Sequence, residues 1–154
     1  MEFPVIPRQL REEAVIEGNI YFFEKNVSFG VPKHMHVCVK RNDRLLFFST
    51  CSSQIKTAQR LSQYKGWDIN TFPVFPANER TNRFDAPLTY VNCNRCYDIP
   101  VSEFVDMMER GEVRLLNGSF TEDDMSLIRS GVLKSSQIPR EIKVLFNTEV
   151  KQKG

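Results

Sequence analysis

The segment at residues 34–53 (HMHVCVKRNDRLLFFSTCSS) constrains the fold more strongly than any other part of this sequence. Apolar side chains alternate with more polar ones over residues 35–40, and this period of two predicts a strand with one buried face. A polar turn at residues 40–44 and a second apolar run at residues 45–48 follow. Together they predict a β-hairpin, two strands joined by a tight connection.

The two far ends of a hairpin lie side by side, so the start and the end of this segment should meet. Both histidines of the chain, His34 and His36, stand at the start, and residues two apart on a strand share one face. The end of the segment is rich in hydroxyl groups, at Ser49, Thr50, Ser52 and Ser53. We expect any chemistry of the protein where these two groups of side chains approach each other.

Length and composition predict one globular domain. The chain has 154 residues, of which 41% are hydrophobic and 26% charged, and its 12 phenylalanines supply a large apolar area to bury. A chain of this size is expected to form a single core, and this composition argues against disorder. The formal net charge of +2 permits a nucleic acid as partner but does not require one.

The sequence also predicts the compartment. No segment approaches the roughly 20 apolar residues of a membrane span, and the first residues contain no apolar run of signal-peptide length. We therefore expect a cytoplasmic protein, not bound to a membrane, whose cysteines are reduced thiols.

The four cysteines are expected to pack rather than to react. Cys38 and Cys51 stand in apolar strand-like runs, where a free cysteine behaves as a small hydrophobic residue. Cys93 and Cys96 form a Cys-x-x-Cys motif, which is half of a zinc site, but no second pair with the usual spacing follows. A redox motif fits badly, because it opens a helix whereas Cys93 continues a predicted strand. We predict no metal site.

Outside the hairpin, the pattern predicts a mixture of strands and short helices. A first strand is expected at residues 19–23, which are almost continuously apolar, and another at residues 88–96, with residues 97–100 ending it. Helices are expected at residues 8–17, 54–64, 102–110, 122–130 and 136–146.

Several helix ends have recognisable signals. Ser102 is expected as an N-cap, and Thr121 followed three residues later by Asp124 is close to a capping box. Glycines typically follow the last turn of a helix, so Gly66 and Gly131 are expected to end the helices before them.

Residues 65–88 form the longest stretch without a regular pattern, and long loops in compact domains are often functional. Arg80 and Arg83 alternate there with aromatic residues, a mixture that holds a single-stranded backbone while bases stack on the rings. The aromatic residues are Trp67, Phe72, Phe75 and Phe84. The other interpretation is that these rings anchor the loop onto the core.

The order of these segments resembles the PemK/MazF family of toxin endoribonucleases over residues 18–130. The opening residues, Gly18-Asn19-Ile20, are similar to that family's Gly-x-Ile strand. The other segments that carry the resemblance are residues 36–39 (HVCV), 45–50 (LLFFST), 89–95 (TYVNCNR) and 118–125 (GSFTEDDM).

The resemblance implies a mainly β fold with peripheral helices, in the form of an SH3-like, partly open barrel. The barrel would occupy residues 18–130 and include the long loop at residues 65–88. Residues 1–17 would form an N-terminal extension, and residues 131–154 a C-terminal helical extension.

Members of this family generally cleave RNA without a metal, by activating the ribose 2′-hydroxyl against the adjacent phosphate. By position, the hydroxyl that they use at the end of the third strand would be Thr50 or Ser49. Lys33-His34-Met35-His36 stands where the family has Arg-Pro. The resemblance thus implies an endoribonuclease without cofactors that acts on single-stranded RNA. It further implies a homodimer and a small antitoxin protein as partner.

The residue types at the hairpin ends suit this chemistry. RNA cleavage needs a base for the 2′-hydroxyl and an acid for the leaving oxygen, and His34 and His36 can exchange protons near neutral pH. Lys33 would add charge, and hydroxyls at Thr50 and Ser52 would donate to the phosphate oxygens. The residues predicted to bind substrate are Lys33, Ser52, Ser53, Arg80, Arg83 and Arg95.

The alternative is a non-catalytic SH3-like barrel that binds a protein or a nucleic acid. Under that hypothesis His34 and His36 are only surface residues or satisfied interior residues. The two histidines therefore discriminate between the two functions.

Overall fold

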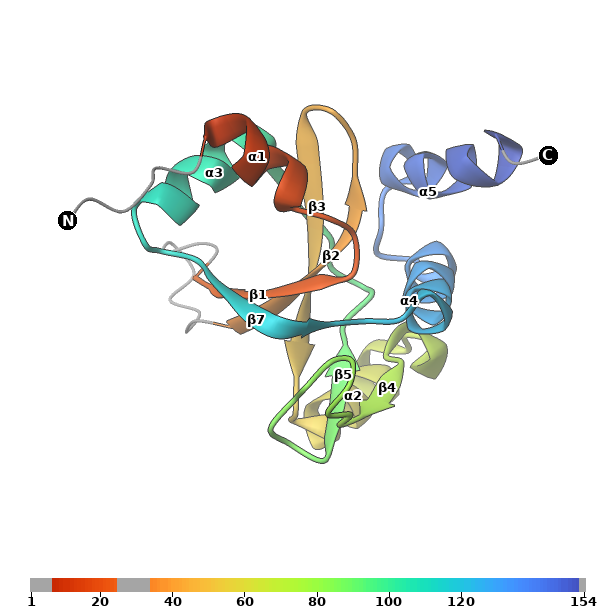
Figure 1. Ribbon diagram of the computed structural model, residues 1–154. Helices are drawn as coiled ribbons and strands as arrows, with labels where there is room; N and C mark the ends of the chain where they lie inside the picture. The colour runs from red at the N-terminus through yellow and green to blue at the C-terminus, as the bar shows by residue number, and fades with distance from the viewer. Residues whose placement is uncertain (1–6, 25–33, 153–154) are drawn as a thin grey trace.

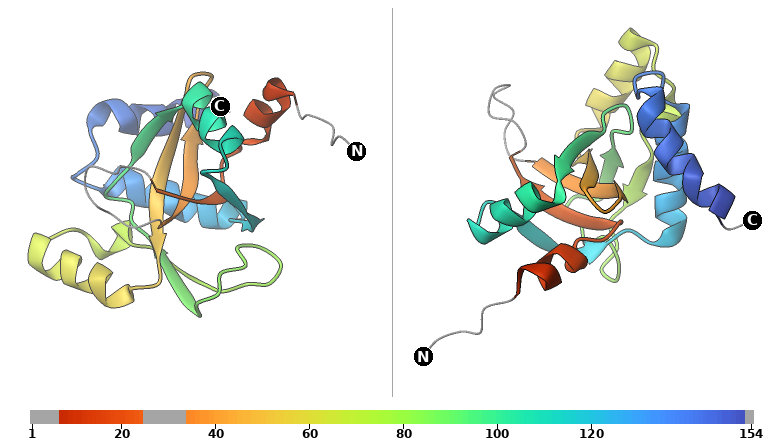
Figure 2. Two further views of the ribbon diagram at one scale, coloured as in Figure 1. Left: turned by 90° about the vertical axis from the view of Figure 1, so that its left-hand side faces the viewer. Right: turned by 90° about the horizontal axis from the view of Figure 1, so that it is seen from above.

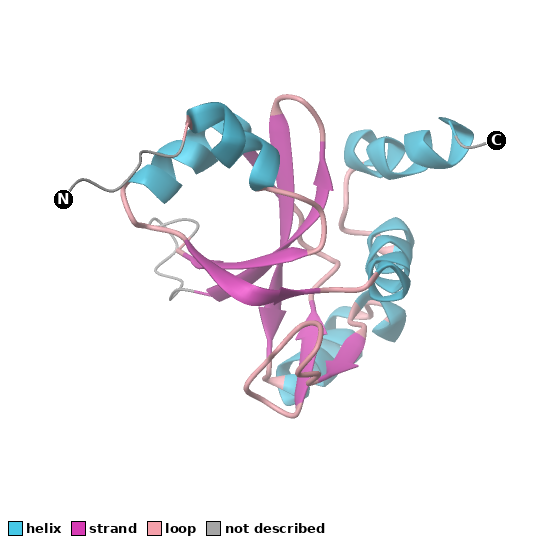
Figure 3. Ribbon diagram, viewed as in Figure 1, coloured by secondary structure: helices cyan, strands magenta, loops and turns pink. Residues whose placement is uncertain are grey.

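The computed structural model describes residues 7–24 and 34–152, with side chains as far as residue 147. The elements follow one another in this order (Figures 1 and 3): α1 (Arg8–Ala14), β1 (Asn19–Phe23), β2 (His34–Arg41), β3 (Leu45–Ser52), α2 (Ile55–Lys65), η2 (Ile69–Thr71), β4 (Val74–Pro76), β5 (Leu88–Val91), β6 (Tyr97–Pro100), α3 (Val101–Glu109), β7 (Arg114–Ser119), α4 (Glu122–Lys134) and α5 (Arg140–Gln152).

The strands of the described residues form one curled antiparallel sheet, an open half-barrel with five α-helices around it (Figure 1). The strand order is β4-β5-β3-β2-β1-β7, and β6 pairs with β3 outside this path. Strand β3 pairs with β2 along one side, while β5 and β6 pair with different parts of its other side. The predicted mainly β fold with peripheral helices is therefore confirmed.

The central hairpin forms as predicted. Strands β2 and β3 pair antiparallel, and Asn42 closes their connection by donating its backbone N–H to the carbonyl of Leu45 at 3.0 Å. The Asn42 side chain also accepts the backbone N–H groups of Arg44 and Leu45, at 2.9 and 2.8 Å. This use of asparagine is the reason for its preference in turns.

The sheet has a hydrophobic core on each face. Helices α4 and α5 lie on one side of the sheet (Figure 2), where Ile128 and Phe146 join Val37 of the hairpin in one cluster. Helix α3 covers the other face, where Phe104 packs with Phe23 and with further residues of β1 and β3. Neighbouring residues of β2 and β3 point alternately into the two cores, so the hairpin is buried on both sides.

Two of the predicted helix signals are confirmed. Helix α2 ends at Gly66, which adopts the left-handed conformation (φ 70°) expected of a C-cap glycine. Helix α4 begins with a complete capping box. The hydroxyl of Thr121 accepts the N–H of Asp124 at 3.1 Å, and the Asp124 carboxylate accepts the N–H of Thr121 at 3.3 Å.

The strand predicted at residues 88–96 is wrong in its second half. Strand β5 ends at Val91, and the chain turns away from the sheet at residues 92–96 before β6 begins. The Asn92 side chain accepts the backbone N–H of Asn94 at 3.1 Å, and Cys93 donates its N–H to Thr71 at 2.9 Å. These bonds replace those of a continued ladder, so the Cys-x-x-Cys motif lies in a turn.

Two helix boundaries also differ from the prediction. Helix α3 begins at Val101, and its N-cap is Pro100, whose side chain has no hydrogen-bond acceptor. Ser102 lies inside the first turn. Ser102 is therefore not an N-cap. Helix α4 continues through Gly131 to Lys134, and the reason for this glycine is packing rather than termination.

The stretch at residues 65–88 is more ordered than predicted. It contains η2 and the short edge strand β4, so its longest irregular part is residues 77–87. The C-terminal helix α5 contributes Phe146 to the core, so the predicted helical extension packs against the sheet.

Candidate functional site

The register of the hairpin brings the predicted histidines and one hydroxyl onto one face. His36 lies opposite Thr50 of β3 and opposite Tyr21 of β1, and His34 lies opposite Phe23. Directly opposed residues in an antiparallel pair have Cβ atoms about 5 Å apart. His36 and Thr50 are therefore direct neighbours, on the face of the sheet that α3 covers. His34 lies on the same face, two residues along β2 and diagonal to Thr50.

His36 is an interior residue. Its side chain is only 2% exposed, and its ring stacks on that of Phe23 with centroids 4.0 Å apart and an interplanar angle of 20°. Its Nε2 lies 3.2 Å from the carbonyl oxygen of Phe23. A carbonyl oxygen only accepts, so this hydrogen bond requires a proton on Nε2. The contact fixes the orientation of the ring.

His34 and Thr50 are half-buried, and both retain contact with solvent. They are thus the members of the cluster that a ligand reaches most directly. Ser52, two residues further along β3 on the same face, is also half-buried, and its hydroxyl accepts the backbone N–H of Gln54 at 3.1 Å. Ser53 is exposed just before α2 begins. The hairpin therefore ends in three accessible hydroxyl groups.

Ser49 lies on the opposite face of the sheet from Thr50, because neighbouring residues of a strand alternate. It is fully buried, and its hydroxyl donates to the backbone carbonyl of Arg95 at 2.9 Å. Of the two hydroxyls that the family resemblance left open, only Thr50 is accessible.

The bond from Ser49 ties the turn at residues 92–96 to the hairpin. Asn94 in this turn is buried and donates its side-chain amide to the hydroxyl of Thr71 at 2.7 Å. Ser135 at the end of α4 donates its hydroxyl to the other side of the same amide, also at 2.7 Å. Arg95 is exposed at the tip of this firmly held turn. The structure thus holds its backbone beside the strand that carries Thr50.

Most of the aromatic residues in the predicted loop at residues 65–88 are anchors. Phe75 and Phe84 are 3% and 6% exposed, and both rings pack on Phe120, with centroids 4.9 and 5.6 Å away. Phe72 is buried as well, whereas Trp67 is half-buried. The interpretation that these rings fasten the loop to the core is confirmed for the three phenylalanines.

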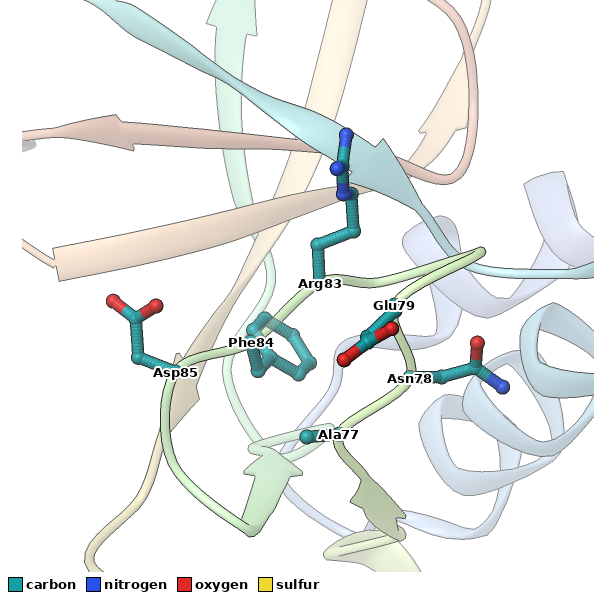
Figure 4. A pocket seen from close by; sticks show the side chains of 6 residues that line it. All are labelled: Ala77, Asn78, Glu79, Arg83, Phe84 and Asp85. Carbon is teal, nitrogen blue, oxygen red and sulfur yellow. The ribbon is translucent and has the colours of Figure 1, made fainter.

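Arg83 also holds this loop in place. It is the one residue other than glycine with a positive φ in the described part of the chain (53°), and its guanidinium donates to the Asn117 carbonyl of β7 at 3.1 Å. A pocket of about 550 Å³ opens beside it (Figure 4). The side chains of Arg83, Asn78 and Asp85 extend in different directions there, so their polar ends do not converge on one point. Arg80 is exposed on the same loop.

The cysteines are mostly buried. Cys38, Cys51 and Cys93 are free thiols in the core, whereas Cys96 is half-buried. Burial raises the pKa of the Cys38 thiol to about 12 and also raises the pKa of Cys51 and Cys93. The prediction that Cys38 and Cys51 pack as hydrophobic residues is confirmed.

Neither a metal site nor a membrane span is found in the described ranges 7–24 and 34–152. No three side chains of histidine, cysteine, aspartate or glutamate gather there as metal ligands. None of the helices in these ranges has the length and apolar character needed to cross a membrane. Lys33, predicted to add charge to the site, lies outside the described residues.

Tyr97 is a member of the site that sequence analysis did not select. It pairs with Phe48 in β3, two residues before Thr50, and therefore lies on the same face. Its ring is half-buried, with its centroid 6.0 Å from that of His36. The alternation of residues 97–100 signals a strand but not its partner, so only the pairing with β3 reveals this neighbour.

Comparison with models of protein families, with curated proteins and with solved structures finds no match for this chain.

Proposed function

We propose that this protein is a toxin-like endoribonuclease with an SH3-like, PemK/MazF-type barrel, which cleaves single-stranded RNA without a metal. The observation that carries the proposal is the pairing of His36 with Thr50, which puts His34, His36 and Thr50 on one face of the sheet. An imidazole beside a hydroxyl suits a reaction that moves protons and stabilises an anionic phosphate.

The burial of each residue suggests its role in the reaction. His34 takes the proton of the ribose 2′-hydroxyl, and the 2′-oxygen attacks the adjacent phosphorus. The bond from phosphorus to the 5′-oxygen breaks, and a 2′,3′-cyclic phosphate remains. The leaving 5′-oxygen takes a proton from solvent water, and His34 later releases to solvent the proton that it accepted. Thr50 donates its hydroxyl to a non-bridging oxygen, while Arg95 and Lys33 supply positive charge. His36, held against Phe23, is a positioning residue.

The proposal also includes the binding partners of the protein and its cellular compartment. The enzyme would act in the cytoplasm as a homodimer, and a small antitoxin protein would inhibit it. Ser52 and Ser53 would contact the RNA backbone beside Thr50.

The test is RNA cleavage in EDTA by the purified protein, with a long single-stranded RNA of mixed sequence. His34→Ala and Thr50→Val should each lower the cleavage rate, the first by about 100-fold or more because it removes the proton-transfer group. Thr57→Ala changes an exposed hydroxyl on α2 and should leave the rate unchanged. An inactive parent protein, or full activity in His34→Ala, would contradict the proposal.

A second variant separates the two histidines. His36→Phe keeps an aromatic ring on Phe23 but has no nitrogen to exchange a proton. If His36 is a positioning residue, replacing it should lower the cleavage rate less than replacing His34 does. The pH optimum of the residual activity should stay the same. A shifted pH optimum in His36→Phe would instead make His36 a proton-transfer residue.

One observation favours a second candidate function. Because His36 is 2% exposed, only one of the two histidines is readily available for chemistry. A barrel that binds single-stranded RNA without cleaving it would fit this arrangement. RNA that is bound but remains intact in the parent protein would favour this binding module over the nuclease.

A further inference from the structure

Tyr97 is a large, partly exposed aromatic side chain that stands within the cluster of His34, His36 and Thr50. Strand β6 carries it, and β6 pairs with β3 in the register Phe48 to Tyr97. The three strands β2, β3 and β6 therefore each contribute to this face of the sheet. The two histidines come from β2, the hydroxyl from β3 and the aromatic ring from β6.

The ring of Tyr97 is held by its surroundings. It packs at the edge of the core cluster beneath α3, and its plane makes an angle of 65° with the ring of His36. His36 in turn lies flat on Phe23. The rings of Phe23, His36 and Tyr97 thus form a row from the buried interior toward the surface. Tyr97, at the outer end of this row, is only half-buried. A ligand that stacks on a ring already held in place loses little conformational entropy of the protein.

From this placement we infer that Tyr97 stacks against a base of single-stranded RNA, next to the ribose whose 2′-hydroxyl reacts beside Thr50. Base stacking on tyrosine needs only a partly open ring face and tolerates every base. Arg95, two residues before Tyr97, is exposed and adds a cation on the same segment for the RNA backbone. The inference rests on the RNA substrate of the proposed function, and it adds the residue that binds the base.

The test measures RNA binding separately from cleavage. A fluorescein-labelled 12-nucleotide RNA pool of mixed sequence, with 2′-O-methyl groups that prevent cleavage, is titrated with the full-length protein and followed by anisotropy. Tyr97→Leu should weaken binding about 10-fold or more. Tyr97→Phe retains the ring and should bind within about 2-fold of the parent, because stacking does not use the hydroxyl. Tyr64→Leu is the matched control, since Tyr64 is 78% exposed at the end of α2.

Equal affinities for Tyr97→Leu and the parent would overturn the inference, as would an equal loss in Tyr97→Phe or a parent that does not bind the pool. A crosslinking experiment needs no variant and covers the case in which Tyr97→Leu does not fold. With the parent protein and 5-iodouridine in the RNA, a crosslink at Tyr97 supports stacking, and crosslinks only elsewhere contradict it.

The outcomes distinguish this inference from the proposed nuclease. Binding that depends on Tyr97 without any cleavage of ordinary RNA would retain the stacking role and reject the nuclease. Cleavage that depends on His34 but not on Tyr97 would retain the nuclease and reject the stacking role.

Discussion

Gly131 lies inside α4, where its backbone packs directly against the turn that carries Arg95. A Cβ at this position would lie 2.8 Å from the sulfur of Cys93, 3.1 Å from its Cβ and 3.2 Å from the carbonyl oxygen of Asn70. Cys93 has no room to move, because it is fully buried and its thiol donates to Ile128 at 3.4 Å. One missing side chain thus sets how closely α4 approaches the turn at residues 92–96.

Gly131→Ala should therefore destabilise the protein. Alanine is favoured over glycine inside a helix by about 1 kcal/mol, but overpacking of a core costs about 1–3 kcal/mol. Since the contacts at 2.8 and 3.1 Å involve a confined residue, we expect the cost to exceed the gain and leave a net loss of about 1 kcal/mol. Urea unfolding measures the effect.

The double variant Gly131→Ala, Cys93→Ala provides the control. Removing the sulfur relieves the shortest contact, so the two changes together should cost less than the sum of each alone. Strict additivity, or an increase in stability for Gly131→Ala, would show that the contact with Cys93 does not limit the packing.

The two histidines show how much of the site is visible in the sequence. Alternation along β2 correctly placed them on one face, and the hairpin pattern correctly brought them close to Thr50. The difference in burial between the two side chains was not predictable, because His34 and His36 have the same local sequence pattern. Burial of His36 depends on Phe23 and Tyr97, which come from other strands. A local period of two identifies a face but does not say what covers it.

Among the elements, the loop at residues 77–87 bridges the two ends of the curled sheet. It joins β4 and β5 at one end of the strand order and bonds to β7 at the other, where Ser119 donates its N–H to Thr81 at 3.0 Å. Asn82 holds the loop in shape. Its side chain accepts the N–H of Phe84 at 3.1 Å and donates to the Pro76 carbonyl at 3.1 Å. The half-barrel is thus braced by an ordered loop.

Gly118→Ala should loosen this brace. A Cβ at Gly118 would collide with the carbonyl oxygen of Thr81 and lie 2.7 Å from that of Asn82. These are backbone atoms, which cannot rotate away as a side chain does, so either the loop or β7 must shift. We expect a loss of about 2 kcal/mol in the free energy of unfolding. Hydrogen exchange at the Ser119 amide should become faster.

Gly66→Ala is the control for this prediction. Gly66 has a positive φ (70°), and a Cβ added to it would meet no atom within 4 Å, so its replacement costs only backbone strain, about 1 kcal/mol. Slow exchange of the Ser119 amide in Gly118→Ala would contradict the bracing role.

The elements that the sequence predicted best are those with local signals. The strand at residues 19–23, the hairpin and the capping box of α4 depend on side chains close in sequence, and all three are confirmed. The turn at residues 92–96 depends on Thr71 and Ser135, which are distant in sequence. Apart from Asn92 and Asn94, nothing in the local sequence therefore indicated that a turn interrupts the predicted strand.

The described part of the molecule is a curled sheet with a core on each face, and the hairpin supplies side chains to both. The apolar runs and helix periods predicted a mainly β fold with peripheral helices. They did not predict which helix covers which face, because that depends on how the sheet curls. Tyr97 joins the candidate site on the face beneath α3 only through the pairing of β6 with β3, which places its ring beside that of His36.

The buried thiols in these cores predict how the stability of the whole molecule depends on pH. Burial is the largest cause of the raised pKa values of Cys38, Cys51 and Cys93, and for Cys38 the pKa rises from 9.0 to about 12. The folded state therefore holds these protons more tightly than the unfolded state does. Their contribution to stability is complete below the unfolded pKa near 9 and is lost as the pH rises toward 12.

We expect the urea midpoint to fall between pH 8 and pH 10, with a loss of about 1 kcal/mol for each of the three thiols at pH 10. Tyr21, whose pKa burial raises to about 12, adds to the loss only above its ordinary value of 10.0. Cys38→Ala should start from a lower midpoint at pH 8, because it leaves a small cavity, but should lose less stability between the two pH values. If the parent protein and Cys38→Ala lose equal stability over this range, the Cys38 thiol does not ionise on unfolding as proposed, and the alkaline loss has another origin.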